Sequence, residues 1–194
     1  MFSATPWLRR TVLGLGVIGL LSVTALAQAA GPTVKFQTSL GEFVVEVYPD
    51  KAPKTVENFL QYVKDKHYDG TIFHRVIGNF MVQGGGYIFS LSEKSTRGPI
   101  PLEANNGLTN DRGTIAMART GNPNSATSQF FINVVDNPGL NAPKPDGHGY
   151  AVFGKVVSGM DIVDKIRNAP TTSKGVFQNL PVTNIIINSA TLTK

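Results

Sequence analysis

An arginine and a glutamine are set into the two apolar runs of residues 73–86, a segment that ends in three glycines. Arg75 and Gln83 are eight residues apart, so both lie on one face if the segment is extended throughout, because strand side chains alternate. Phe73 and Met81 are then on that face too. Burying polar groups among such side chains costs free energy, which favours a functional purpose. The alternative is an arginine on an edge strand that extends its head group to water.

Residues that could bind a metal or act as nucleophiles are scattered. His67, His74 and His148 are the three histidines; none is spaced as HxxxH, and no carboxylate stands beside them at ligand spacing. His74 would point away from Arg75 in a strand, which favours a structural role. The chain has no cysteine, which excludes disulfides, a thiolate nucleophile and Cys-ligated zinc.

Other familiar catalytic patterns are also missing from the sequence. The glycines at 84–86 fit neither GxGxxG nor GxxxxGK[ST] and no helical pattern follows, so we expect a strand end where backbones approach closely. Ser125, Thr127 and Ser128 lie outside any GxSxG motif, and Glu103 is an isolated acid without the second carboxylate that paired-carboxylate hydrolysis would need. If the protein is an enzyme, this pattern favours a reaction without proton transfer or a covalent intermediate.

The first thirty residues differ from the rest of the chain. Arg9 and Arg10 precede an uncharged apolar run from Thr11 to Leu26, and small residues follow, with cleavage expected between Ala27 and Ala30. This pattern predicts a secretory signal peptide over residues 1–30 and a domain over 31–194. The alternatives are a retained membrane anchor and a weakly matching twin-arginine signal. The net charge of +5 falls to +3 without the two arginines, too low to indicate nucleic-acid binding.

The mature part predicts a mainly β domain with two helices. Apolar residues at positions 56, 59, 60 and 63 indicate an amphipathic helix, and a second short helix follows later in the chain. About eight short strands do not alternate regularly with the helices, which favours an antiparallel barrel or sandwich over a parallel sheet. The expected strands are 34–38 and 42–48 (a hairpin), the 73–86 segment, 114–118, 128–134, 150–157 and 182–192; the expected helices are 53–66 and 160–168, and the long loops are 87–112 and 136–149.

Four blocks in the same order make the chain resemble the cyclophilin family of peptidyl-prolyl cis-trans isomerases. They are Phe-His-Arg-Val-Ile followed by Phe-Met-Val-Gln-Gly-Gly at 73–85, Gly-Thr-Ile-Ala-Met-Ala-Arg at 113–119, Ser-Gln-Phe-Phe-Ile-Asn at 128–133, and Tyr-Ala-Val-Phe-Gly-Lys-Val at 150–156. The resemblance covers essentially the whole mature chain, and together with the predicted signal peptide it makes the chain resemble a bacterial periplasmic member. It implies a closed eight-stranded antiparallel β-barrel with a helix capping each end, isomerase activity on X-Pro bonds, and no cofactor or metal.

The resemblance also implies roles for individual residues. Arg75 would be the catalytic residue, donating to the prolyl nitrogen as the amide twists. The proline pocket would be lined by Phe80, Met81, Phe131 and Leu140. Support for Arg75 or for the substrate backbone would come from Gln83, Gln129, Ala118 and the backbone of Arg119, with Tyr150 beside them. Without the resemblance, plain core packing is the favoured interpretation of Phe80, Met81 and Phe131.

Three positions depart from the family pattern. Gly139 stands where the family usually has Trp or Phe, Tyr150 where many members have His, and Arg119 where many have Asn. Because an indole supplies an apolar face and a donor, Gly139 implies weak cyclosporin binding.

The expected partners are proline-containing peptides and unfolded exported proteins, met in the periplasm by a monomer that binds neither nucleic acid nor, after signal removal, a membrane. Two other functions stay open: a receptor or chaperone that holds proline peptides without turnover, which Gly139 favours, and a purely structural β-domain.

Overall fold

The computed structural model describes residues 1–2 and 31–193, and most of the predicted signal peptide lies outside them. Among these residues, one antiparallel sheet of eight strands has the order β10-β1-β2-β7-β5-β6-β4-β3. No helix in the described part of the chain is both long and apolar enough to cross a bilayer. The elements are β1 (Thr33–Thr38), β2 (Gly41–Val47), α1 (Pro53–Lys64), β3 (Thr71–Ile77), β4 (Met81–Ile88), β5 (Thr114–Met117), β6 (Phe130–Asn133), a 3-10 turn (Pro138–Leu140), β7 (Val152–Ser158), α2 (Met160–Arg167), β8 (Thr171–Lys174), β9 (Phe177–Pro181) and β10 (Ile187–Leu192).

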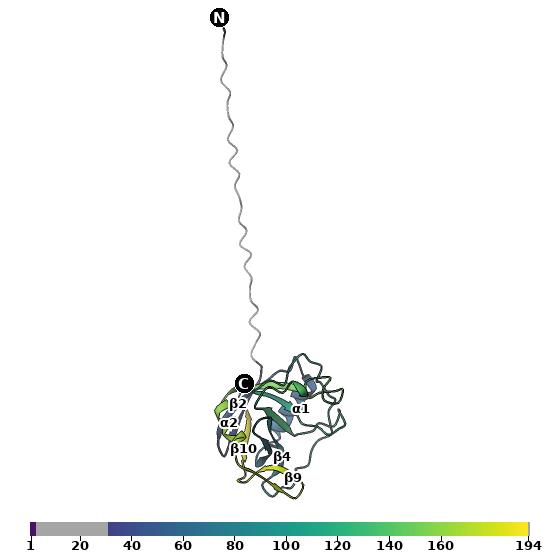
Figure 1. The fold of residues 1–194 in the computed structure, drawn as a ribbon, viewed down its shortest axis with the longest axis vertical. Coiled ribbons are helices and arrows are strands. Elements are labelled where there is room, and N and C mark those ends of the chain that lie inside the picture. Colours follow the sequence, from purple (N-terminus) through teal and green to yellow (C-terminus); the bar gives the residue numbers. More distant parts are fainter. Residues whose placement is uncertain (3–30, 194) are drawn as a thin grey trace.

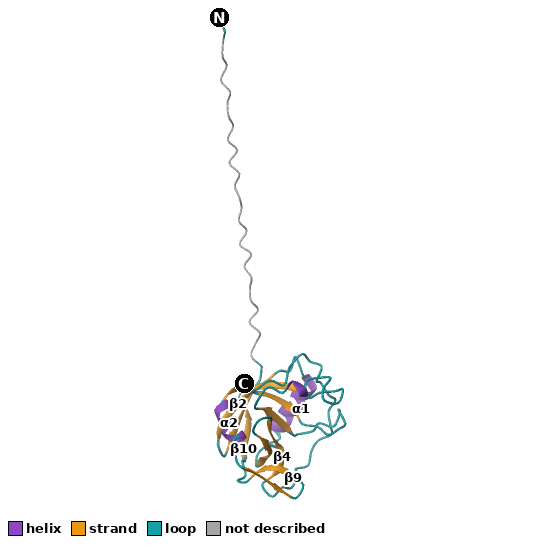
Figure 2. Ribbon diagram, in the orientation of Figure 1, coloured by secondary structure: helices purple, strands orange, loops and turns teal. Residues whose placement is uncertain are grey.

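The two outer strands of this sheet meet, so the sheet is nearly closed into a barrel. The Phe73 N–H donates to the Ile185 carbonyl at 3.0 Å and the Gly70 N–H to the Ile187 carbonyl at 2.8 Å. The predicted hairpin of β1 and β2 is confirmed, as is the mainly β fold with two helices. Closure satisfies the edge groups that an open sheet would expose. Figures 1 and 2 show α1 and α2 on different sides of the strands.

Aromatic rings fill the inside of the barrel. Phe36 stacks on Phe43 with ring centroids 4.9 Å apart, and Phe130 meets Phe36 at 5.5 Å. Phe59 of α1 and Ile166 of α2 belong to the same buried cluster, so each helix covers part of the interior with its apolar face. Burial of each large side chain contributes about 1.5–3 kcal/mol, which makes this cluster the main source of stability.

The helix α1 ends at Lys64, before the predicted Lys66, and a distant acid caps its start. The carboxylate of Glu103 accepts from the backbone N–H groups of Lys54 at 3.2 Å and Thr55 at 2.9 Å. These are among the N–H groups that a helix cannot satisfy internally, and the helix dipole favours a negative charge there. Glu103, to which the sequence assigned no role, therefore stabilises the start of α1.

The 73–86 segment is not extended throughout. It turns after Ile77 and returns as β4, so that Arg75 pairs with Gln83 across a hairpin. Both side chains still share a face, because they are opposite partners. Phe73 does not share it: the register shifts between Phe73 and Arg75, and Phe73 is buried inside the barrel. The prediction that Phe73 shares the face of Arg75 was wrong because it assumed one uninterrupted strand, without the turn after Ile77 and the bulge between Phe73 and Arg75.

The three glycines are inside β4 and not at its end. Gly85 has a φ of +87°, and a Cβ there would lie 2.9 Å from the Tyr68 ring and 3.0 Å from Phe130. The expected close approach of backbones is present at Gly84, where a Cβ would lie 3.1 Å from the Ile72 carbonyl oxygen, while the neighbours of Gly85 are buried rings.

A second, two-stranded sheet formed by β8 and β9 was not predicted. The four residues of β8 are polar and exposed, so they show no apolar alternation. The hairpin is fixed instead by β9, which packs against β3. Figure 1 shows β9 close to β4, in agreement with the contact between the Phe177 and Tyr87 rings.

Candidate active site

A row of opposed residues crosses four neighbouring strands on the outer face of the barrel. Arg75 of β3 is opposite Gln83 of β4, which is opposite Phe131 of β6, and Phe131 is opposite Ala116 of β5. Their sequence neighbours Val82, Phe130 and Ile115 point into the interior instead. The row therefore follows from the period-2 alternation of each strand, together with the register of the sheet.

Over this row lies a pocket of about 100 Å³, which we call the outer pocket. Nine of the ten predicted site residues line it: Arg75, Phe80, Met81, Gln83, Ala118, Arg119, Phe131, Leu140 and Tyr150. Its apolar floor is a cluster separate from the barrel interior, centred on Met81, Ala116, Phe131 and Val152. The tenth residue, Gln129, is next to the pocket and hydrogen-bonded to Gln83. The structure thus brings the predicted residues together without assigning their roles.

The Arg75 guanidinium is half-buried and held by an amide. Its Nη1 donates to the Gln83 Oε1 at 3.4 Å. None of the ion pairs found in residues 31–193 involves Arg75. Its remaining donors are therefore not committed to a carboxylate, and they lie beside the apolar floor of the outer pocket, where a hydrogen bond is stronger than in water.

Two amides continue from Arg75 to an acid. The Gln83 Nε2 donates to the Gln129 Oε1 at 2.9 Å, and the Gln129 Nε2 donates to the Glu93 Oε1 at 3.4 Å. We call Gln83, Gln129 and Glu93 the amide relay. Each link fixes the orientation of the next amide, so that Gln83 presents its oxygen to Arg75. Sequence reasoning missed Glu93, because it lies in a loop-like stretch where no spacing relates it to Gln129.

The Arg119 side chain ties down the loop that closes the outer pocket. The side chain is 2% exposed, and its Nη2 lies 2.8 Å from the Asp146 carboxylate. Its Nε donates to the Gly149 carbonyl at 3.0 Å, and its guanidinium carbon is 4.4 Å from the centre of the Tyr150 ring. Hydrogen bonding from Arg119 lowers the pKa of Asp146 below its usual range. The sequence pointed to the backbone of Arg119, whereas the structure also gives its side chain a structural task.

Leu140 and Tyr150 form the rim of the outer pocket on this side. The Tyr150 N–H donates to the Leu140 carbonyl at 2.9 Å, and the Tyr150 ring meets Phe131 edge-on at 5.7 Å. Gly139 is exposed, and a Cβ on it would meet no described atom within 4 Å. The position where the family usually has an aromatic residue is therefore open, and the rim is built from Leu140 and Tyr150.

His74 is buried beside Arg75 but does not line the outer pocket. Its ring meets Tyr87 at 4.7 Å. Burial, and secondly the positive charge of Arg75, lower the pKa of His74 to about 4, so it is neutral near pH 7. Within residues 1–2 and 31–193, no group of three His, Asp or Glu side chains is placed to hold a metal ion.

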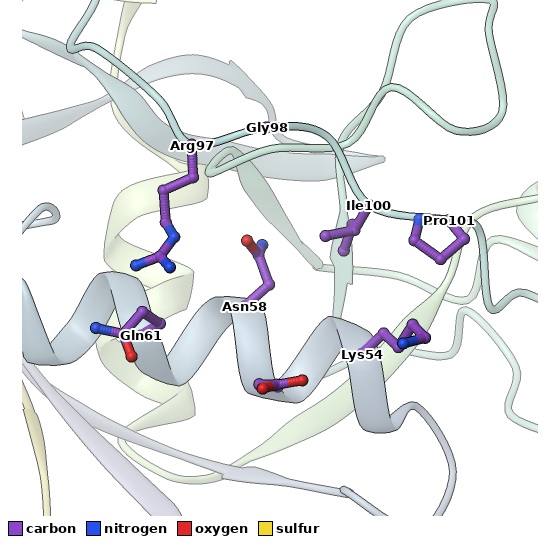
Figure 3. Close-up of a pocket in the computed structure, with 8 residues that line it drawn as sticks. Lys54, Asn58, Gln61, Arg97, Gly98, Ile100 and Pro101 are labelled. Carbon is purple, nitrogen blue, oxygen red and sulfur yellow. The ribbon is translucent and has the colours of Figure 1, made fainter.

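A different cavity, of about 340 Å³, lies between α1 and the segment around residues 97–101 (Figure 3). In Figure 3, Asn58 projects from the helix into this space, and the Arg97 side chain points from the opposite segment towards the helix near Gln61. None of the predicted site residues lines this cavity. Five of its eight lining residues are polar or charged and none is aromatic, whereas Phe80, Met81 and Phe131 give the outer pocket large apolar side chains to receive a prolyl ring. The outer pocket is therefore the better candidate for an active site.

Comparison with known proteins identifies the family. The family model for cyclophilin type peptidyl-prolyl cis-trans isomerase/CLD matches residues 33–192. The chain belongs to this family. A peptidyl-prolyl cis-trans isomerase of Acinetobacter baylyi is 56% identical over 174 residues, covering 90% of each chain. Peptidyl-prolyl cis-trans isomerase B of Escherichia coli is 52% identical over 163 residues, covering 83% of this chain and 99% of the relative.

Solved structures agree with the fold. The crystal structure of a Cryptosporidium parvum cyclophilin type isomerase superposes with a TM-score of 0.69 at 29% identity, covering 84% of this chain and 98% of that one. A second crystal structure of the parasite enzyme was determined in the presence of the dipeptide Ala-Pro. The predicted β-barrel of the cyclophilin type is confirmed, and the chain is a peptidyl-prolyl cis-trans isomerase.

Proposed function

We propose that this cyclophilin isomerises X-Pro bonds of exported proteins in the periplasm, with Arg75 as its catalytic residue and the outer pocket as its proline pocket. Rotation about an X-Pro bond is slow because amide resonance opposes it, with a barrier of about 18–20 kcal/mol. Twisting localises the lone pair of the prolyl nitrogen, which becomes a hydrogen-bond acceptor. A guanidinium aimed at that nitrogen stabilises the twisted amide more than the planar one, which is the requirement for catalysis.

The state of Arg75 is the observation that carries this proposal. It is half-buried at the edge of an apolar pocket, and the described residues hold its guanidinium with an amide instead of a carboxylate. One charge-assisted hydrogen bond is worth about 1.5–3 kcal/mol, or roughly a ten- to hundredfold rate increase. The apolar floor formed by Met81 and Phe131 supplies a second contribution, because removing water from the planar amide favours the less polar twisted state.

Two substitutions test the role of Arg75. Arg75→Ala is expected to abolish most of the rate increase measured by NMR exchange on an X-Pro peptide, while the barrel stays folded because this side chain lies outside its interior. Arg75→Lys keeps the charge but loses the planar fork of donors, and is expected to lose most activity as well. Turnover at the wild-type rate in either variant would refute the assignment.

The same experiment separates catalysis from mere binding. A protein that holds proline peptides without turnover would shift their resonances but leave the cis-trans exchange rate at its uncatalysed value. The open position at Gly139 is the feature that favours such a holding role. Acceleration that depends on Arg75 contradicts it.

Export is supported by the sequence of residues 1–30. The test is to express the full chain in a Gram-negative host, separate the periplasmic fraction and sequence the amino terminus of the protein found there. Cleavage between Ala27 and Ala30 is the expected result. An intact amino terminus in the cytoplasmic fraction would refute both export and the periplasmic location.

Weak cyclosporin binding is part of the proposal, since no side chain extends from Gly139. Gly139→Trp restores the aromatic group into open space and is expected to tighten binding in a calorimetric titration. Tight binding by the wild-type protein would show that Leu140 and Tyr150 suffice.

A further inference from the structure

The β8–β9 hairpin forms one wall of a second cavity beside the active site. This cavity, of about 460 Å³, shares Arg75 and Gln83 with the outer pocket, and we call it the hairpin cavity. Its far wall is the end of the hairpin, including Val176 and Phe177. Arg75 therefore stands between two cavities, one of which the reaction at the prolyl nitrogen does not use.

Three rings lie together along the hairpin cavity. Phe177 meets Tyr87 at 5.0 Å with ring planes at 90°, and both lie next to His74, at 6.4 Å and 4.7 Å respectively. Val176, at the tip of the hairpin, is 89% exposed and also lines the cavity. His74 is neutral near pH 7, so Arg75 is the positive charge in this wall. Such walls suit an aromatic ring, which can meet Phe177 or Tyr87 edge-on and offer its face to a guanidinium.

The hairpin is held in place before any ligand arrives. Its base is closed by the Val182 N–H, which donates to the Pro170 carbonyl at 2.9 Å. The two strands pair in antiparallel register, and the Ser173 Oγ donates to the Gln178 Oε1 at 2.9 Å. A wall fixed in this way loses little conformational entropy on binding, which favours affinity.

From this geometry we infer that the hairpin cavity binds the side chain of an aromatic residue adjacent to proline, and that the hairpin sets this preference; the inference rests on the proposed function. Neighbouring Cα atoms are about 3.8 Å apart across a trans peptide and about 2.9 Å across a cis one. The proposed function places the prolyl nitrogen at Arg75, so the side chain of a neighbouring residue lies within reach of Arg75 and Gln83, which line both cavities. The occupant is thus a second side chain of the same substrate.

The test compares kcat/KM for three peptides: Ala-Ala-Pro-Ala as the reference, Ala-Phe-Pro-Ala and Ala-Ala-Pro-Phe. For the wild-type protein, one of the two Phe peptides is expected to exceed the reference by about three- to tenfold, the range for one aromatic contact. The ratio of Phe peptide to reference is expected to fall towards one in Phe177→Leu and in the double variant with Val176→Ala. Phe89→Leu and Val182→Ala are matched controls, because both residues are exposed and outside the hairpin cavity, and they should keep the wild-type ratio.

Each other outcome counts against the inference. A wild-type ratio near one for both Phe peptides overturns it, and so does a preference that survives in the double variant. Equal loss for all three peptides in the hairpin variants leaves the ratio unchanged and shows that the hairpin only supports the fold. If the wild-type protein isomerises none of the peptides, the proposed function fails together with the inference; activity without an aromatic preference removes the inference alone.

Discussion

Adding one methyl group at Gly86 is expected to lower activity by disturbing the amide relay. A Cβ at this position would lie 2.6 Å from the Gln129 Cγ and 2.8 Å from its Cδ and Nε2. All three atoms belong to one half-exposed side chain, so Gly86→Ala moves Gln129 and not the backbone. Gln83 then loses the acceptor that its Nε2 reaches at 2.9 Å, and is free to turn away from Arg75.

The size of the effect follows from the bond that is lost. A neutral hydrogen bond contributes about 0.5–1.5 kcal/mol net, so kcat/KM should fall by roughly two- to thirteenfold. The unfolding midpoint should hardly change, because Gln129 lies outside the barrel interior. Gly98→Ala is the matched control, since a Cβ at Gly98 meets no described atom within 4 Å.

A double-mutant cycle distinguishes this explanation from general damage to β4. In a Gln129→Ala background the methyl group has nothing to displace, so Gly86→Ala should cause almost no further loss of kcat/KM. Additive losses in the double variant, or wild-type activity in Gly86→Ala alone, would refute the role given to the amide relay.

Four further outcomes are expected. Glu103→Ala should lower the free energy of unfolding in urea by about 1–2 kcal/mol, because it removes the acceptor at the start of α1. The pKa of His74 is about 4 in the folded protein and 6.5 in the unfolded chain, so the unfolded chain takes up a proton first as the pH falls. The free energy of unfolding should therefore decrease by up to about 3 kcal/mol between pH 6.5 and 4, and His74→Gln should remove this decrease. The isomerisation rate should stay constant between about pH 6 and 8, since none of the histidines and carboxylates in residues 31–193 lines the outer pocket, and a bell-shaped profile would contradict the mechanism. Arg119→Lys should raise KM by about three- to tenfold with less effect on kcat, because lysine cannot hold Asp146 and the Gly149 carbonyl at once; an unchanged KM would show that the loop is fixed by other contacts.

Most of the outer pocket could be predicted from the sequence because its residues come from strands. Once β3, β4 and β6 are placed side by side, alternation decides that Gln83 and Phe131 face outward while Val82 and Phe130 face inward. Alternation within one strand does not indicate which strands are neighbours in the sheet, and the family resemblance supplied that information. The same-face relation of Arg75 and Gln83 was right for the wrong reason, since a hairpin and not a single extended strand joins them.

The parts that were missed depend on contacts between segments without a pattern of their own. Glu93 and Glu103 lie in the long loop, and only the folded chain brings one to Gln129 and the other to the start of α1. The exposed residues of β8 carry no apolar alternation, and the role of Phe177 depends on its contact with Tyr87, which is distant in the sequence. Such long-range side-chain contacts are set by tertiary packing, which local propensity does not encode.

The amide relay also explains why Arg75 is oriented by glutamine. A carboxylate at about 4 Å would attract the guanidinium by about 4 kcal/mol at an effective dielectric constant of 20, and would compete with the prolyl nitrogen for its donors. The Gln83 oxygen orients the same group with a weaker, neutral acceptor. Glu93 acts at the far end of the relay, where two amides separate it from Arg75 while its charge still fixes their direction. In the proposed mechanism, the relay would therefore hold the donor in position and leave its positive charge available to the twisted amide.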